Sequence, residues 1–224
     1  MLLFDIGANR GEVTDLAFDK GFMKVIACEA APRIFKHLVS DRIYNRDVVP
    51  LRVAVSDKDN QRVSFYEANE DGLSTLNIDW LTADTMPYKG KAYRTIQANT
   101  ITIDTLVSVY GVPDLIKIDV EGAEWNVLHG ITKRYKTISL EWTFATLSEH
   151  EEQLDYLYKL GYREFAPQYI VNHLEEPTEW FKLKKSNAKQ LLIWHQETSD
   201  DWIDGGWKVA GLRPTADVGM LWVR

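Results

Sequence analysis

The stretch Leu2-Leu3-Phe4-Asp5-Ile6-Gly7-Ala8-Asn9-Arg10-Gly11-Glu12 determines how the rest of the chain is interpreted. An apolar run containing one acid leads into a turn with two glycines, and the residues after the turn have helical spacing. A strand that leads through a glycine-bearing turn to a helix N-terminus is typical of a nucleotide-type binding site. Gly7 is expected to let the backbone approach a ligand, Gly11 to let helix pack on strand, and Asn9 to tolerate a left-handed conformation.

The spacing of this turn narrows the choice of ligand. It reads Asp5-x-Gly7-x-Asn9-x-Gly11, which is not the G-x-G-x-x-G fingerprint of dinucleotide-binding proteins, and no Lys-Ser/Thr pair of a P-loop follows. An acid two residues before the first glycine would repel a pyrophosphate but suits a cationic ligand. The pattern therefore points to S-adenosylmethionine, which carries an amino group and a sulfonium. An ordinary tight strand-to-helix turn is the alternative.

Length and composition limit the class of protein. The 224 residues suggest one sizeable domain, or one domain with a cap, and 45% hydrophobic residues are enough for a full core. A net charge of -7 without a long basic run disfavours nucleic acid as the main partner. The single cysteine, Cys28, excludes an internal disulfide framework and is expected to be a buried structural thiol.

Targeting signals are not recognisable in the chain. No apolar segment reaches membrane-spanning length, and Asp5 and Arg10 interrupt the start where a signal peptide would need an apolar run. A reducing, cytoplasmic compartment is therefore expected. The chain begins almost on its first strand, which is compatible with a domain excised from a longer protein that carries partner domains.

Strand-like and helix-like segments alternate along the chain, which favours βαβ units, an α/β class and a mainly parallel sheet with helices on both faces. The expected strands are residues 2–6, 24–28, 48–55, 62–66, 94–103 (an edge strand), 115–118 and 137–140, then one strand within 162–171 and the last at 218–223. The expected helices follow Gly11 and Pro32 and cover residues 104–110, 123–128 and 149–160. Residues 175–211 are rich in tryptophan and form either a lid over the acceptor or satellite core packing.

Several polar side chains fall at the carboxyl ends of predicted strands, where ligands bind in open α/β sheets. Glu29 ends the second strand and is expected to accept hydrogen bonds from both ribose hydroxyls, the alternative being a plain acidic loop residue. Ser56 and Asp57 end the third strand, where an adenine edge would lie, although this segment also reads as a solvated turn.

A second group of acids follows two later strands. Asp119 and Glu121 come after residues 115–118, and Glu141 after residues 137–140, so the three carboxylates are expected to share one site. Clustered carboxylates either raise one pKa, which makes a base, or bind a hard cation such as Mg²⁺ or Mn²⁺. Glu121 and Glu124 also suit the first turn of a helix, where the macrodipole favours acids.

The histidines do not form a metal pair or a nucleophile motif. His37 and His129 lie in helical patterns and are expected at the surface or in caps. His150 and His173 follow predicted strands and remain candidate site residues.

Four further segments complete a recognisable pattern. Phe4-Asp-Ile-Gly-Ala-Asn-Arg-Gly-Glu12 resembles the first motif of class I S-adenosylmethionine-dependent methyltransferases, and Cys28-Glu-Ala-Ala-Pro32 resembles their acidic second motif. With these, the chain is similar to the FkbM family over roughly residues 2 to 142. The four segments are Ala54-Val-Ser-Asp57, Gly72-Leu-Ser-Thr-Leu76, Thr102-Ile-Asp-Thr-Leu106 and Ile116-Lys-Ile-Asp-Val-Glu-Gly-Ala-Glu124.

The resemblance implies a Rossmann-like, seven-stranded sheet with an antiparallel last strand, and O-methylation of a sugar or natural-product hydroxyl. It implies that Glu29 holds the ribose, that Ser56 lies near the adenine and that Asp119 lies beside the reacting methyl group. The methionine part would be cradled by the first turn. The expected cofactor-binding residues are Asp5, Gly7, Ala8, Asn9, Gly11, Glu12, Glu29, Ala30, Ser56, Asp57 and Asp119.

The leading hypothesis is an O-methyltransferase that acts on a carbohydrate hydroxyl, with Asp119, Glu121 and Glu141 as catalytic residues or cation ligands. An O-methyltransferase of a non-sugar small molecule and a non-catalytic S-adenosylmethionine-binding interaction module are the alternatives. A nicotinamide dehydrogenase is disfavoured by the glycine spacing and by the lack of a second domain.

Overall fold

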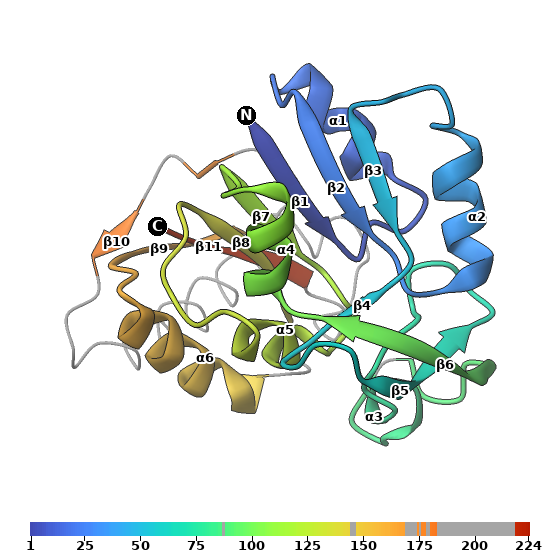
Figure 1. The fold of residues 1–224 in the computed structure, drawn as a ribbon. Coiled ribbons are helices and arrows are strands. Elements are labelled where there is room, and N and C mark those ends of the chain that lie inside the picture. Colours follow the sequence, from blue (N-terminus) through green and yellow to red (C-terminus); the bar gives the residue numbers. More distant parts are fainter. Residues whose placement is uncertain (87, 144–146, 169–173, 175, 178–179, 183–217) are drawn as a thin grey trace, which may run out of the picture.

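The chain folds into a three-layer α/β structure in a computed structural model (Figure 1). The structure describes residues 1–86, 88–143, 147–168, 174, 176–177, 180–182 and 218–224. Among these residues, no helix is long and apolar enough to cross a membrane.

The central layer is one large sheet in the strand order β10-β9-β11-β8-β7-β1-β2-β3. Strands β3, β2, β1, β7 and β8 pair in parallel, and the last strand, β11, lies antiparallel between β8 and β9. This confirms the expected seven-stranded sheet, to which the two-residue β10 adds an edge strand. The strands are β1 Leu2–Ile6, β2 Lys24–Cys28, β3 Val48–Leu51, β7 Leu115–Ile118, β8 Ile138–Thr143, β9 Glu164–Gln168, β10 Phe181–Lys182 and β11 Val218–Val223.

Helices cover both faces of this sheet (Figure 1). Strand β1 shows why, because Leu3 packs with residues of α1 and α2 while Phe4 and Ile6 pack with α4 and α5 on the other face. The helices are α1 Glu12–Asp19, α2 Pro32–Ser40, α3 Asp79–Thr82, α4 Ile103–Tyr110, α5 Glu124–His129 and α6 Leu147–Leu160. Pro32 stands at the start of α2, as the sequence suggests. Helix α4 is capped by the side chain of Thr102, which accepts from the N–H of Thr105.

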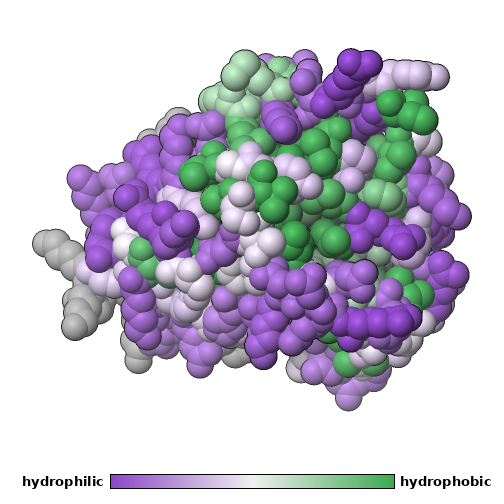
Figure 2. All heavy atoms as spheres, in the orientation of Figure 1, coloured by the Kyte–Doolittle hydropathy of each residue, from purple (hydrophilic) through white to green (hydrophobic). Residues whose placement is uncertain are grey.

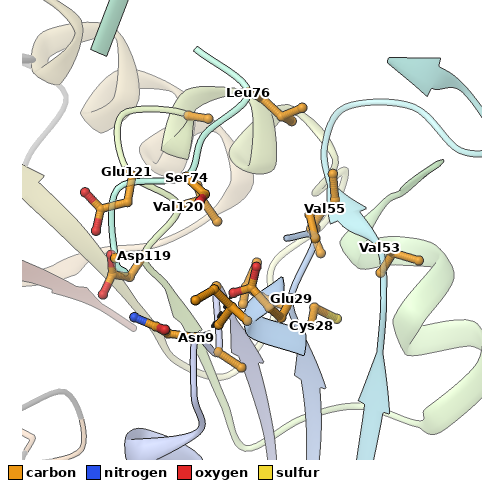
Figure 3. Close-up of a pocket in the computed structure, with 18 of the residues that line it drawn as sticks. Asn9, Cys28, Glu29, Val53, Val55, Ser74, Leu76, Asp119, Val120 and Glu121 are labelled. Atoms are coloured by element: carbon orange, nitrogen blue, oxygen red, sulfur yellow. Dashed lines mark hydrogen bonds between the residues drawn. The ribbon is translucent and has the colours of Figure 1, made fainter. Parts of the chain in front are cut away.

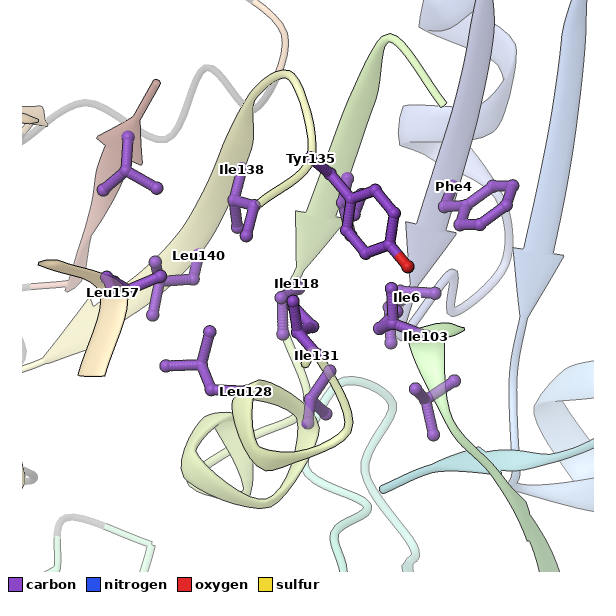
Figure 4. Packing of buried hydrophobic residues seen from close by; sticks show 14 of the residues in the cluster. Phe4, Ile6, Ile103, Ile118, Leu128, Ile131, Tyr135, Ile138, Leu140 and Leu157 are labelled. Atoms are coloured by element: carbon purple, nitrogen blue, oxygen red, sulfur yellow. The ribbon is translucent and has the colours of Figure 1, made fainter. Parts of the chain in front are cut away.

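The larger core cluster lies between the sheet and helices α4, α5 and α6. Figure 4 shows Phe4, Ile6, Ile118 and Leu140 from the strands facing Leu128 and other helix residues. These side chains are fully buried. Burial of apolar surface stabilises the folded state by about 25 cal/mol per Å². The cluster therefore stabilises the packing of the helices on the strands whose ends carry the site.

Apolar side chains continue from this cluster to the surface beside α4. Val49 and Leu51 of β3 are partly buried against the cluster, whereas Val109 and Val112 are exposed. Figure 2 shows apolar side chains gathered where Figure 1 places α4, β2 and β3.

A second, three-stranded sheet lies beyond the carboxyl ends of β1, β2 and β3 (Figure 1). It consists of β4 Ala54–Val55, β6 Tyr93–Ile101 and β5 Arg62–Ala68, in the order β4-β6-β5. The expectation of one strand over residues 48–55 was wrong, because the chain leaves β3 at Leu51 and Ala54 then pairs with Thr100 of β6. The expectation of an edge strand over 94–103 was also wrong, because β6 is central and pairs on both sides.

Pro50 is accommodated because β3 is the outermost strand of the large sheet, and an edge strand tolerates a residue without an N–H donor. Beyond it, residues 69–92 connect β5 to β6 and include α3. This connection, called the β5–β6 insert below, returns to the carboxyl ends of the parallel strands.

Candidate active site

A pocket lies at the carboxyl ends of the parallel strands, where they meet the small sheet. The empty space in and above it, open solvent included, is about 850 Å³. Figure 3 shows Asp119 and Glu121 on one side, Val53 and Val55 on the other, and Glu29 between them. The lining residues are Ile6, Gly7, Ala8, Asn9, Glu12, Val13, Cys28, Glu29, Ala30, Ile34, Val53, Ala54, Val55, Phe65, Gly72, Ser74, Leu76, Lys117, Asp119, Val120, Glu121 and Ala123.

The turn after β1 forms the floor of the pocket. The N–H groups of Gly7 and Ala8 both donate to the carbonyl of Cys28, at 3.0 and 2.9 Å, which fixes the turn against β2. Gly7 has φ of 74°, and a Cβ there would overlap the carbonyl oxygen of Asp119. Gly7 is therefore required for the close approach of β1 to the end of β7. It also lines the pocket, and its close approach to a ligand stays a prediction.

Asn9 and Gly11 shape the rest of this turn. Asn9 adopts φ of 49°, as expected for a residue that tolerates the left-handed region, and its Oδ1 is buried without a hydrogen-bond partner among the described residues. Gly11 has φ of 91° and does not line the pocket. The expectation that it lets a helix pack on a strand was wrong. A Cβ there would overlap the guanidinium of Arg42, which donates to the carbonyl of Gly11 at 2.7 Å.

Glu29 lies at the middle of the pocket and is 9% exposed. Its Oε2 accepts from the N–H of Asn9 at 3.0 Å and its Oε1 from the N–H of Ala31 at 2.7 Å. Burial raises the pKa of Glu29 to about 7, although the hydrogen bonds from Ala31 and Asn9 lower it. The carboxylate thus connects the end of β2 to the turn after β1. A ligand that extended from one end of the pocket to the other would contact it. Its contact with a ribose stays a prediction.

Asp5 lies outside the pocket lining, although it was expected to contact the cofactor. Its side chain is fully buried beneath the first turn, where Oδ2 accepts from the hydroxyl of Thr14 at 2.6 Å. Oδ1 lies 3.4 Å from the ammonium of Lys117, a pocket residue that sequence reasoning missed. The signal was present, because Lys117 lies in an apolar strand two residues before Asp119, on the same face of that strand.

Asp119, Glu121 and Glu141 come together as expected. One carboxylate oxygen from each lies within 4.8 Å of the others. Glu141 belongs to β8 and does not follow it, because that strand continues to Thr143. Glu124 fills a local role instead: its Oε1 accepts from the N–H of Val120 at 2.9 Å and so closes the turn before α5.

The acid cluster suits a hard cation. Burial, and then the neighbouring acids, raise the pKa values of Glu121 and Glu141 well above their ordinary value. Oε2 of Glu141 is buried without a hydrogen-bond partner among the described residues. In a six-coordinate Mg²⁺ site adjacent ligand oxygens are ~2.9 Å apart and opposite ones ~4.2 Å, so the three carboxylates would have to move closer together to bind one ion.

The other end of the pocket is apolar and is formed by Ile34, Val53, Val55, Phe65 and Leu76. Sequence reasoning missed these residues, because Phe65 and Leu76 come from the small sheet and the β5–β6 insert. Ser56 and Asp57, which were expected beside an adenine, do not line the pocket. The Ser56 hydroxyl donates to Asp57 at 3.2 Å, and the Ser56 N–H donates to the carbonyl of Ile101.

Of the two histidine candidates, only His150 is among the described residues, and it does not line this pocket. His150 lies in α6 and does not directly follow a strand; it is buried and its ring stacks on Trp142 with a centroid distance of 4.1 Å. His173 lies outside the described residues, as does most of the tryptophan-rich segment 175–211. Of the other two, His37 lies in α2 and His129 in α5.

The chain belongs to the FkbM methyltransferase family. The family model described as the methyltransferase FkbM domain matches residues 5–164, which span all of the pocket residues. Methyl transfer is therefore its class of reaction, and the sheet order is that of a Rossmann-like methyltransferase. No curated protein sequence gives a significant match.

Solved structures with a similar fold include three methyltransferases at low identity. Precorrin-6y C5,15-methyltransferase from Geobacter metallireducens GS-15 is 11% identical, with 100% of this chain and 80% of that chain covered and a TM-score of 0.41. The plantazolicin methyltransferase BpumL, in complex with a triazolic desmethylPZN analog and SAH, is 10% identical, with 100% of this chain and 76% of that chain covered and a TM-score of 0.40. StiE O-MT residues 942–1257 are 12% identical, with 99% and 66% covered and a TM-score of 0.42.

Proposed function

We propose that this chain is an S-adenosylmethionine-dependent O-methyltransferase that acts on a sugar hydroxyl. The observation that carries the proposal is the division of the pocket: an apolar compartment at one end, a carboxylate cluster at the other, and Glu29 between them. This order matches a ligand with an aromatic base, a hydroxylated sugar and a cationic, reactive end.

The cofactor fits the residues of the pocket. Val53, Val55 and Leu76 offer apolar faces for adenine, Glu29 offers carboxylate oxygens to ribose hydroxyls, and the unpartnered Oδ1 of Asn9 is an acceptor for the ammonium group. When bound, S-adenosylmethionine supplies an electrophilic methyl group. The acidic end of the pocket places anionic side chains near the sulfonium and the α-ammonium, which are both cationic.

The acid cluster would hold and activate the acceptor. A sugar hydroxyl is a poor nucleophile at neutral pH, so a base or a cation must assist its deprotonation. Asp119, Glu121 and Glu141 can do this directly, since the pKa values of Glu121 and Glu141 are raised, or by holding Mg²⁺ or Mn²⁺ through oxygen ligands. The remaining contribution is alignment of the acceptor oxygen with the methyl group.

The surroundings of the cluster favour an uncharged, hydroxyl-rich acceptor. Three neighbouring carboxylates repel phosphate and carboxylate groups, which also disfavours nucleic acid. Tyr88 is half-buried and packs against Trp80 with a centroid distance of 5.1 Å and a tilt of 46° between the rings. Burial, and then the charges of Glu121, Glu141 and Asp119, raise the pKa of Tyr88 to about 12, which places this phenol in the field of the cluster. Aromatic faces with polar tips suit sugar rings.

The proposal is tested with methyl-labelled S-adenosylmethionine and a panel of glycans and non-sugar alcohols, followed by location of the methyl group. Label on a sugar oxygen, lost in Asp119→Asn, supports it. Label only on a non-sugar hydroxyl would support O-methylation but would contradict a sugar as the acceptor. Binding of S-adenosylhomocysteine without transfer to any acceptor would favour a non-catalytic module instead.

A further inference from the structure

Lys117 connects two parts of the pocket that come from different strands. Its side chain is 3% exposed, and its ammonium donates to the carbonyl of Gly7 at 2.9 Å. The same nitrogen lies 3.4 Å from Oδ1 of Asp5 and 3.4 Å from Oδ2 of Asp119. The ammonium thus makes one hydrogen bond and two ion pairs with groups from two strands.

The sheet itself dictates this arrangement. Lys117 of β7 is paired in register with Asp5 of β1 on one side and Ser139 of β8 on the other. Neighbouring strands are about 4.8 Å apart, so the side chain of Lys117 spans from its own strand to the turn after β1. Gly7 lies two residues after Asp5, and Asp119 two residues after Lys117, which puts both on the pocket side.

The ammonium lies among groups of opposite charge. Burial lowers the pKa of Lys117, but the carboxylates of Asp119 and Asp5 raise it above its ordinary value. The nitrogen is buried and donates to Gly7 beside these two carboxylates, so its contribution comes through the groups that it contacts.

We propose that Lys117 is a positioning residue that fixes the distance between the cofactor turn at Gly7 and the acceptor-side carboxylate of Asp119. This inference rests on the proposed function, because it assigns Gly7 to the methyl-donor side and Asp119 to the acceptor side. One oxygen of Asp119 is held by Lys117, which orients the carboxylate toward Glu121 and Glu141. The competing explanation is that Lys117 only neutralises the buried charge of Asp5.

The two explanations separate in a cycle of Asp5→Asn, Lys117→Met and the double variant. Methionine has nearly the length of lysine and no donor, and removal of both charges together avoids an unpaired buried ion. If Lys117 only neutralises Asp5, the double variant should recover both thermal stability and turnover. If Lys117 positions Asp119, the double variant should recover stability, while kcat stays about 100-fold below wild type and KM for the cofactor changes little.

Amide hydrogen exchange of the cofactor-free protein provides a readout that needs no acceptor. The turns at residues 7–12 and 119–122 should exchange faster in the double variant than in Asp5→Asn, which keeps the lysine. Equal exchange in both turns, or wild-type kcat in the double variant, would overturn the proposal. Absence of methyl transfer in the wild-type protein would count against the proposed function alone, and the exchange comparison would still decide the role of Lys117.

Discussion

The indole N–H of Trp80 donates a hydrogen bond to Oε2 of Glu121 over 3.2 Å, although the two residues are 41 positions apart in the chain. The contact is closely fitted, since a Cβ on Gly122 would lie 2.5 Å from Cε3 of Trp80, and Asn77 donates to the carbonyl of Gly122 at 3.0 Å. Glu121 itself adopts φ of 58°, a left-handed conformation that is unfavourable for glutamate. The β5–β6 insert therefore holds one carboxylate of the acid cluster in place.

Trp80→Phe should lower kcat about tenfold, because a hydrogen bond to a charged group contributes roughly 1.5–3 kcal/mol. Trp80 is fully buried, so the smaller ring should also lower thermal stability, and kcat is compared in folded protein. Trp125→Phe is the control: Trp125 is partly buried and packs against His129 and Tyr156 instead of the acid cluster. Equal kcat in both variants would show that Trp80 does not hold Glu121.

Gly7→Ala should destabilise the fold instead of simply blocking the cofactor. The added Cβ would overlap the carbonyl oxygen of Asp119 and lie 2.8 Å from its carbonyl carbon, so β1 and β7 would have to separate. Gly90→Ala is the matched control, because Gly90 has φ of 83° with no atom within 4 Å of the added Cβ. It carries only the backbone strain of a left-handed alanine, about 1–2 kcal/mol.

Urea denaturation of the two alanine variants measures this difference. The free energy of unfolding should fall by at least ~2 kcal/mol more in Gly7→Ala than in Gly90→Ala, as for overpacked cores. An equal decrease in the free energy of unfolding in both variants would mean that β1 and β7 can separate at Gly7 at little cost.

Affinity for S-adenosylhomocysteine should depend on pH through Glu29. The ionised carboxylate is the form that accepts from ribose hydroxyls, and its pKa in the free protein is raised to about 7 by burial. Below about pH 7 the affinity should fall roughly tenfold per pH unit, since each binding event must first remove a proton. Calorimetry measures the dissociation constant of S-adenosylhomocysteine as a function of pH. A range of roughly pH 5.5 to 8.5 covers both sides of that pKa.

Glu29→Gln should bind weakly at every pH, without this dependence, because it cannot ionise. Glu70→Gln is the control, since Glu70 is exposed and paired with Lys91 outside the pocket lining. It should keep the wild-type profile. An unchanged profile in Glu29→Gln would exclude Glu29 as the ribose ligand.

The parallel strands and the acids at their ends could be predicted because each is a local pattern in the sequence. Buried parallel strands are short apolar runs, and the acids that follow them, such as Glu29 and Asp119, must meet at one edge of the sheet. The apolar wall could not be predicted, because Phe65 and Leu76 reach the pocket from the small sheet and the β5–β6 insert, and the sequence does not show where these pack. Lys117 could have been singled out from its place in an apolar strand, but its partners Asp5 and Gly7 belong to another strand and its turn, which a single strand does not reveal.

Cation binding should stabilise the protein most at high pH. The folded-state pKa of Glu141 is raised well above its ordinary value of 4.5 by burial and by Asp119 and Glu121. A carboxyl group with a raised folded-state pKa contributes stability that is present below pH ~4.5 and is lost as the pH rises through the folded-state pKa. The cation-free protein should therefore lose thermal stability as the pH rises from about 5 to 8.

A divalent cation replaces the proton as the positive charge among these carboxylates. Mn²⁺ or Mg²⁺ should raise the melting temperature at pH 8 more than at pH 5, and EDTA should reverse the gain together with any cation-dependent turnover. Glu141→Gln should reduce the stability loss, because Glu121 keeps a raised pKa of its own, and should abolish the response to cation, whereas Glu70→Gln should keep both. If EDTA leaves turnover unchanged and Glu141→Gln still abolishes it, Glu141 acts as the base without a cation. If Asp119→Asn, Glu121→Gln and Glu141→Gln all keep turnover near wild type, the acid cluster has no catalytic role and alignment of acceptor and methyl donor must account for the rate.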